Sequence, residues 1–501
     1  MLSEQQKHIQ KIRKEFSHGS KRSKDSLNNA IKALSNDLYT KDTHFIFELV
    51  QNAEDNEYSE LEPSLSFHLQ KIDPTIPLGS DGALIVLNNE TGFSYKNVDA
   101  ICAVGESTKS KHKGYIGEKG IGFKSVFRVS YNPHIFSNGY HFCLPEKDEE
   151  TGLGYIVPRW IEETHEEIEP NKTNIIMPLK PDFGFEQIKE MLRDIRPETI
   201  LFLSKLKEIH IKTDDGDDLT ILKDDTKFPF VQMMVEGRKA NKSISLMDEF
   251  LLFTDTFSKP SHIHHEKREN INARDVSIAF PLSGDSEFDG KIFAYLPLQM
   301  NTEFPFIINA DFILPSSREN ISDRKRDLSW NLWLMECVAR LVSKALLILK
   351  NNNLLTVSML EKLSGKLIKI SEDDIFYPIA GVIQETLMEE ELLPSDDGTF
   401  VSTKNAKLAA SADLRELLSV HRLRELYQSE YEIKWVSAEI TEGRTPNLRN
   451  YLMKKLNVSE IDSDGFARKI TKSFLQAQSD DWMISFYKFL SKQKALWKRK
   501  Y

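Results

Sequence analysis

The chain has 501 residues, of which 40% are hydrophobic and 28% are charged, and its formal net charge at pH 7 is −10. This composition is ordinary for a soluble globular protein of two or three domains, and the acidic balance gives no general attraction to nucleic acid. The three cysteines lack paired or metal-site spacing, which excludes a disulfide framework and argues for a reducing compartment. The polar N-terminal segment does not resemble a signal peptide, so we expect a cytoplasmic protein.

Two helices are predicted at the start of the chain. Residues 45–57 form a helical pattern that places Glu48, Asn52 and Asp55 at i, i+4 and i+7 on one face. A carboxylate in this position can orient and deprotonate a water, and a carboxamide oxygen one turn away suits Mg²⁺. The helix before it is predicted by apolar residues at helical spacing, namely Leu27, Ile31, Leu34 and Leu38.

A glycine-rich segment, G-E-K-G-I-G-F, follows at residues 117–123. Its glycines let the backbone approach a phosphate and point N–H groups at it. Two apolar residues of the segment are expected to anchor a following helix over residues 124–129, whose N-terminus favours anions. The residues predicted to bind here are Gly117, Gly120, Ile121, Gly122 and Phe123.

Each of these two patterns alone is more often a solvated helix face or a simple turn. Their order and spacing together favour a nucleotide site. The segment is not a Walker A loop, because Phe123 lies between Gly122 and the Lys-Ser pair. It is not a dinucleotide fingerprint either, because no glycine follows Gly122 at the required place.

Four phrases of the chain resemble the GHKL superfamily of ATPases (gyrase, heat-shock chaperone, histidine kinase and MutL), with the closest likeness to ATP-binding domains of the sacsin and NO VEIN type. The resemblance implies an α+β fold, a GHKL (Bergerat) sandwich of α and β layers. It covers about the first two-fifths of the chain well and residues up to about 350 more loosely. The phrases are D-T-H-F-I-F-E-L-V-Q-N-A-E-D at 42–55, L-N-N-E-T-G-F at 87–93, G-E-S-T-K at 105–109 and Y-I-G-E-K-G-I-G-F-K-S-V-F at 115–127.

The resemblance implies ATP and Mg²⁺ as cofactors and gives roles to particular residues. Glu48 corresponds to the general base and Asn52 to the magnesium ligand, while Asp55 corresponds to a contact with the nucleotide or its water shell. The lysines at 109–113 lie in the presumed lid, where they either meet phosphates or are solvated. The G-E-S-T-K phrase adds three nucleotide-binding candidates, Ser107, Thr108 and Lys109.

Adenine recognition in the superfamily uses an aspartate that opens a D-x-G-x-G turn. By register from Gly92, that position is read as Asn88, whose carboxamide can accept from the adenine amino group. Asn89 is the adjacent candidate, although strand alternation points it the other way. Thr173 matches the last superfamily motif, a Gly-Thr pair before a strand, with Lys172 in place of the glycine.

The strand-rich part from 216 to 350 resembles the transducer domain that follows the ATP site in this superfamily. Its phrase L-P-S-S-R-E-N-I, residues 314–321, resembles a segment of the heat-shock chaperone's middle domain. The resemblance implies that Arg318 reaches the γ-phosphate as an arginine finger does; the alternative is a surface arginine paired with a neighbouring acid. His262 and His264 fit a solvated hairpin tip better than a metal site.

Three domains are expected: residues 1–215 for ATP binding, 216–350 as the transducer-like domain and 351–501 as a mostly helical region without a catalytic constellation. The first boundary is placed at the D-D-G-D-D turn, residues 214–218, where consecutive aspartates are expected to face solvent. The most apolar stretch, residues 332–349, carries three charges on one helical face, so it is expected to pack within the protein and not to span a membrane.

The sequence therefore predicts a Mg-ATP-hydrolysing conformational machine with chaperone-like or remodelling activity. The alternative is an ATP-switched interaction module with little turnover, as in a bacterial (antiviral) defence or nucleic-acid-processing system. The expected partners are a protein client or partner subunit and a second copy of the chain in a homodimer; nucleic acid finds no support in the net charge. The chain is also compatible with being one portion of a longer protein.

Overall fold

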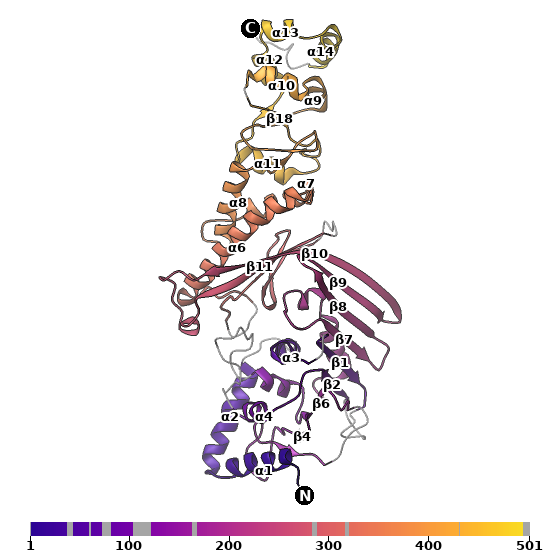
Figure 1. Cartoon of the computed structure of the whole chain (residues 1–501), viewed down its shortest axis with the longest axis vertical. Helices are drawn as coiled ribbons and strands as arrows, with labels where there is room; N and C mark the ends of the chain where they lie inside the picture. Colours follow the sequence, from indigo (N-terminus) through magenta and orange to yellow (C-terminus); the bar gives the residue numbers. More distant parts are fainter. Residues whose placement is uncertain are drawn as a thin grey trace.

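The computed structural model describes residues 2–37, 44–59, 62–72, 82–103, 122–162, 168–282, 288–315, 320–429 and 431–493. The molecule is elongated, with its N-terminus and C-terminus at opposite ends of the long axis (Figure 1). Helices and a curved sheet form the N-terminal half, and a column of helices leads from the sheet to the C-terminal end. Among the described residues, no helix is both long enough and apolar enough to cross a membrane.

A single mixed sheet of 14 strands organises the first two-thirds of the described chain. Its order is β13-β12-β14-β11-β10-β9-β8-β7-β1-β2-β6-β3-β4-β5. β1 pairs with β7 in parallel, as does β12 with β14, and the other neighbours are antiparallel. The strands are β1 (Ser64–Gln70), β2 (Ala83–Asn88), β3 (His134–Ser137), β4 (Tyr140–Cys143), β5 (Arg159–Trp160), β6 (Thr173–Pro178), β7 (Glu208–Thr213), β8 (Asp218–Lys227), β9 (Phe230–Lys239), β10 (Lys242–Ser258), β11 (Ala273–Pro281), β12 (Lys291–Ala294), β13 (Leu296–Asn301) and β14 (Ile307–Ala310).

The N-terminal helices cover one face of this sheet. Leu84 and Val86 on β2 point into the main N-terminal core, whereas Ile85 and Leu87 point to a smaller cluster on the opposite face, as strand alternation requires. β2 is therefore buried on both sides. The helices are α1 (Glu4–Ser17), α2 (Lys21–Asp37), α3 (His44–Asp55), α4 (Tyr95–Ile101) and α5 (Phe185–Arg193), with short 3₁₀ helices η1 (Gly122–Arg128), η2 (Pro197–Ile200) and η3 (Glu266–Arg268).

Two expectations about this half need correction. The helix expected at 124–129 is the 3₁₀ turn η1, because all four residues 124–127 are buried and Ser125 Oγ donates to Gly122 O at 2.6 Å, which favours a short, tight turn. The aspartates of the 214–218 turn do not all face solvent: Asp217 is buried, accepting from Arg193 Nε at 2.8 Å and from Ala240 N at 2.7 Å. That turn joins β7 to β8 within the same sheet.

A second hydrophobic core joins the far end of the sheet to four helices, and a third core lies beyond them. The α+β class expected from the sequence is therefore observed. The helices of the second core are α6 (Lys325–Asn351), α7 (Val357–Leu367), α8 (Tyr377–Glu389) and α11 (Pro446–Lys454). The helices of the third core are α9 (Ala412–Leu417), α10 (Val420–Tyr427), α12 (Ser463–Lys469), α13 (Lys472–Gln476) and α14 (Asp480–Lys492). Two small sheets lie between them, built from β15 (Leu393–Pro394), β16 (Phe400–Val401), β17 (Ala406–Ala409), β18 (Lys434–Trp435) and β19 (Glu460–Ile461).

Candidate functional site

The helix α3 holds the predicted acid–amide pattern against the sheet. Its apolar residues, Phe45, Ile46, Leu49, Val50 and Ala53, are buried in the N-terminal core and fix the rotation of the helix. Glu48 and Asp55 are buried on the same helix, and Asn52 is half-buried between them. The three side chains are thus held by a packed element and do not form an ordinary solvated face.

The glycine-rich segment meets this helix at Gly122. A Cβ placed on Gly122 would lie 2.1 Å from Glu48 Oε2, so any larger residue there would displace that carboxylate. Phe123 packs against the same core from the next position. The structure therefore brings the two predicted segments together. The remaining candidates of the lid region, Ser107, Thr108, Lys109, Gly117, Gly120 and Ile121, lie outside the described residues.

Lys124 follows directly and buries its ammonium group. Nζ donates to Tyr155 O at 2.9 Å and also to Ile101 O, at the end of α4. Burial lowers the pKa of Lys124 from 10.5 to about 8. Because Ile101 and Lys124 flank the region between 104 and 121, this contact ties the two described ends of that region together.

A hydroxyl–carboxylate cluster lies where β2 ends and β6 begins, on the face that α3 covers. Thr173 Oγ1 donates to Glu90 Oε1 at 2.6 Å and is 2.6 Å from Ser137 Oγ, which accepts from Phe93 N at 2.8 Å. Glu90 is buried, and burial raises its pKa, against the opposing effect of the hydrogen bonds from Thr173 and the Gly92 backbone. Gly92 has φ +89°, and a Cβ there would lie 2.7 Å from Asn138 Cβ.

Asn88, the residue expected to read adenine, is hydrogen-bonded within the protein. Its Nδ2 donates to Ser64 O at 2.8 Å and to the Tyr58 hydroxyl at 2.9 Å, while its Oδ1 accepts from Asn56 Nδ2 at 3.0 Å. Asn89 bonds the same loop, with Oδ1 accepting from Ser64 N at 2.8 Å. Both carboxamides therefore join β2 to the segment between α3 and β1.

Glu90 is the polar residue that the sequence reading missed. In a D-x-G-x-G turn the acid stands two residues before the first glycine and four before the second, so Asn88 keeps the register with Gly92 as the second glycine, and Glu90 stands two residues before Gly92. Thr173, expected from a separate motif, is the hydrogen-bond partner of Glu90. Glu90 is thus a second polar candidate beside Asn88, identified by its burial and by its bond to Thr173.

Glu54 anchors the C-terminal end of α3. Its Oε1 accepts from Ser204 N and Oγ, both at 2.7 Å, and from Lys205 N at 3.0 Å; its Oε2 accepts from Leu206 N at 2.9 Å. Lys205 Nζ in turn donates a hydrogen bond to Asn56 O at 2.6 Å, just beyond the end of α3. The helix that carries Glu48, Asn52 and Asp55 is thereby fixed to the segment that leads into β7.

Arg318 lies outside the described residues, but both flanks of its loop are described. Ser322 N donates to Ile313 O at 3.0 Å and closes the loop. Asn331 on α6 binds both flanks, with Oδ1 accepting from Ile313 N at 2.8 Å and Nδ2 donating to Ser322 O at 3.0 Å. Next to it, Asp311 accepts from Arg268 at 2.7 and 2.8 Å.

Metal sites built from side-chain clusters do not occur in the described part of the chain: it holds no group of three or more His, Cys, Asp or Glu residues that could bind an ion. His262 and His264 are exposed in a loop, whereas His265 is buried, with Nε2 3.0 Å from Asp327 Oδ1. The carboxamide Asn52 does not require such a cluster, because Mg²⁺ in nucleotide sites is held by one or two protein ligands together with phosphates and waters.

Comparison with known proteins shows that the chain is similar to sacsin-like proteins. Residues 24–149 match the family model of the Sacsin domain. The chain is 35% identical to Protein NO VEIN of Arabidopsis thaliana over 337 residues, covering 62% of this chain and 11% of that protein. It is 23% identical to human Sacsin over 378 residues, covering 60% of this chain and 8% of that protein. These matches support the sacsin and NO VEIN family, and the chain spans only a small fraction of either relative's length.

Proposed function

We propose that the chain binds Mg-ATP at α3, η1 and the ends of β2 and β6, in a site of the GHKL type, and hydrolyses it. The observation that carries the proposal is the contact between Gly122 and Glu48. It joins a glycine-rich backbone, suited to phosphates, to a buried carboxylate, suited to a general base.

One group of residues is assigned to the phosphates of the nucleotide and another to its base. Glu48 orients and deprotonates the attacking water, Asn52 supplies its Oδ1 to Mg²⁺, and Asp55 binds the ion's water shell. When bound, Mg²⁺ neutralises charge on the phosphate oxygens. At the other end, the carboxylate of Glu90, oriented by the Thr173 hydroxyl, accepts from the adenine amino group.

The test separates binding from turnover. Calorimetric titration with Mg-ATP should show binding by the wild type and loss of binding in Asn52→Ala, whereas Asn351→Ala, an exposed asparagine on α6, should bind normally. Glu48→Ala should bind ATP but release phosphate about 10²–10⁴-fold more slowly. Equal ATP affinity of Asn52→Ala and the wild type would remove the site.

We further propose that ATP turnover drives a conformational change that acts on a protein client, with Arg318 reaching the γ-phosphate on closure. An Arg318→Ala variant should then lower kcat, by up to about 10³-fold, with little change in nucleotide affinity. If ATP binds tightly but the wild type releases no phosphate, the site acts as a ligand switch instead.

A further inference from the structure

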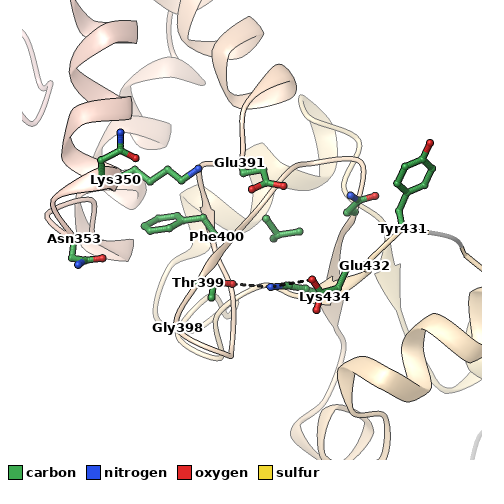
Figure 2. Close-up of a pocket in the computed structure, with 12 residues that line it drawn as sticks. Lys350, Asn353, Glu391, Gly398, Thr399, Phe400, Tyr431, Glu432 and Lys434 are labelled. Carbon is green, nitrogen blue, oxygen red and sulfur yellow. Dashed lines mark hydrogen bonds and ion pairs between the residues drawn. The ribbon is translucent and has the colours of Figure 1, made fainter.

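A polar cleft of about 610 Å³ lies between the second and third cores, far along the chain from α3 (Figure 2). One wall is formed by the C-terminal end of α6 and the β15–β16 hairpin, and the other by residues 431–434, which lead into β18. We call it the α6–β16 cleft. Val401 in its lining belongs to the second core, and Ile433, next to the lining residue Lys434, belongs to the third. Ligand sites often form where two such units meet.

The hairpin side of the cleft is rigid. Lys434 Nζ donates to Thr399 Oγ1 at 2.9 Å and pairs with Asp397 at 2.9 Å. Asp397 Oδ1 in turn accepts from Thr399 N at 3.0 Å and from Ser395 Oγ at 2.7 Å. These bonds fix the tip of the hairpin before any ligand binds, which lowers the entropy cost of binding.

Two opposite charges in the lining are not neutralised by the protein. In the part of the chain that the structure describes, neither Lys350 nor Glu391 forms an ion pair with any residue. The Lys350 ammonium instead lies 5.8 Å from the centre of the Phe400 ring. Figure 2 shows Lys350 extending from the end of α6, past Phe400, toward the segment that carries Glu391. A ligand that carries both signs of charge would satisfy both groups.

The balance of charge in the lining decides between classes of ligand. Two lysines face two glutamates, and Asp397 lies directly behind Lys434. A polyanion such as single-stranded nucleic acid requires an excess of basic residues, which this lining lacks. A polypeptide carries both signs and adds peptide groups, which donate and accept as the carboxamides of Asn351, Asn353 and Asn405 do.

An exposed aromatic ring marks the rim of the cleft. The Tyr431 side chain is 72% exposed, although tyrosine usually buries most of its ring. Tyrosines are enriched among the residues that dominate binding energy at protein interfaces. Phe400 is half-buried and lies on the opposite wall, so each wall of the cleft carries one aromatic side chain.

We propose that the α6–β16 cleft binds an extended polypeptide segment of another protein, with an acidic side chain at Lys350, a basic side chain at Glu391 and an aromatic or aliphatic side chain against Tyr431. The proposal does not depend on nucleotide binding at α3. It gives the far end of the molecule a recognition role of its own.

The test uses an unfolded polypeptide and its folded counterpart as probes. Reduced, carboxamidomethylated α-lactalbumin, labelled with fluorescein, is titrated with the full chain in the absence of nucleotide, and fluorescence anisotropy is measured. Disulfide-intact α-lactalbumin has the same sequence without the extended backbone. We expect binding of the unfolded probe alone, weakened about 5- to 30-fold in Tyr431→Ala and in the double variant Lys350→Ala/Glu391→Gln.

A matched control variant shows whether the loss of binding is specific to the cleft. Tyr487 on α14 is 64% exposed and lies outside the cleft, so Tyr487→Ala should bind like the wild type. Photo-crosslinking from benzoylphenylalanine at position 431, but not at 487, should capture the unfolded probe. Equal loss in the two tyrosine variants, or no binding of the unfolded probe, would overturn the proposal. So would tighter binding of a thymidine 20-mer that Tyr431→Ala abolishes, which would assign the cleft to nucleic acid.

Discussion

Removal of the Glu54 carboxylate should lower the free energy of unfolding more than removal of any other carboxylate on α3. The side chain is 4% exposed, and its two oxygens accept from three successive backbone N–H groups, at Ser204, Lys205 and Leu206, and from one hydroxyl. A hydrogen bond to a charged acceptor contributes about 1.5–3 kcal/mol, so the three backbone donors alone sum to about 5–9 kcal/mol. Part of this free energy is regained in the variant, because no charge is buried there and water can reach the N–H groups of residues 204–206. We therefore expect Glu54→Ala to cost about 3–5 kcal/mol, the usual cost of removing one partner of a buried charged contact.

The assay is urea unfolding followed by circular dichroism, with the free energy of unfolding extrapolated to water. Glu54→Gln should fall between the wild type and Glu54→Ala, because a carboxamide keeps one acceptor oxygen but turns an NH₂ group toward the remaining backbone donors. Glu57, exposed just beyond α3, provides the control, and Glu57→Ala should change stability by less than about 0.5 kcal/mol. If Glu54→Ala also stays within about 0.5 kcal/mol, the anchor contributes nothing and the argument from its hydrogen bonds is refuted.

Two glycines and one lysine give further predictions. Gly122→Ala should displace the Glu48 carboxylate, which a Cβ would approach to 2.1 Å, and should slow phosphate release about 10²-fold. Gly381 lies in an open position on α8, so Gly381→Ala should raise the free energy of unfolding in urea by about 0.5–1 kcal/mol. The lowered pKa of Lys124, about 8 against 10.5, means that the unfolded state binds more protons between these values. The cost of burying the charged ammonium is then complete below pH 8 and is relieved as pH rises to 10.5, so stability should rise by about 3 kcal/mol in that window, and Lys124→Met should abolish the rise. Gly122→Ala turnover equal to the wild type, or the same pH dependence in Lys124→Met, would contradict these expectations.

The helix period and the glycine chemistry made the meeting of Glu48 with Gly122 predictable. The helix period puts Glu48 and Asn52 on one face, and the glycines of 117–123 let the backbone approach a phosphate, so both segments were expected to contact one nucleotide. The α+β class followed from the same patterns. These features are local, or repeat with a known period, so they leave a trace in the order of residues.

Side-chain contacts with backbone groups could not be predicted from the sequence in this way. The partners of Glu54 are N–H groups of residues 204–206, which any non-proline sequence would offer. The pairing of β7 with β8 across residue 215 likewise uses backbone ladder bonds, so a turn that resembles a domain boundary lies inside one sheet. Asn88 illustrates a different difficulty. Its partners Ser64, Tyr58 and Asn56 are set by how the segment before β1 folds back, which the sequence pattern does not reveal, and its contact with adenine stays a prediction.

Glu90 offers the sharpest test of the nucleotide end of the site. If its carboxylate accepts from the adenine amino group, the protein should prefer ATP to inosine triphosphate, whose base carries a carbonyl oxygen at that position and would repel the carboxylate. Glu90→Gln keeps the size of the side chain and adds an NH₂ donor, so calorimetry should show that this preference falls at least about tenfold or reverses, since one lost or gained polar contact is worth about 1.4 kcal/mol or more. Thr173→Val should weaken ATP binding with a smaller change in preference, because it removes only the hydroxyl that orients Glu90. Asn88→Ala is the discriminating control: its bonds hold the loop before β1, so it should lower the free energy of unfolding and leave the preference intact. An unchanged preference in Glu90→Gln together with its loss in Asn88→Ala would return the base-reading role to Asn88 and show that the polar cluster at Thr173 only holds β2 and β6 together.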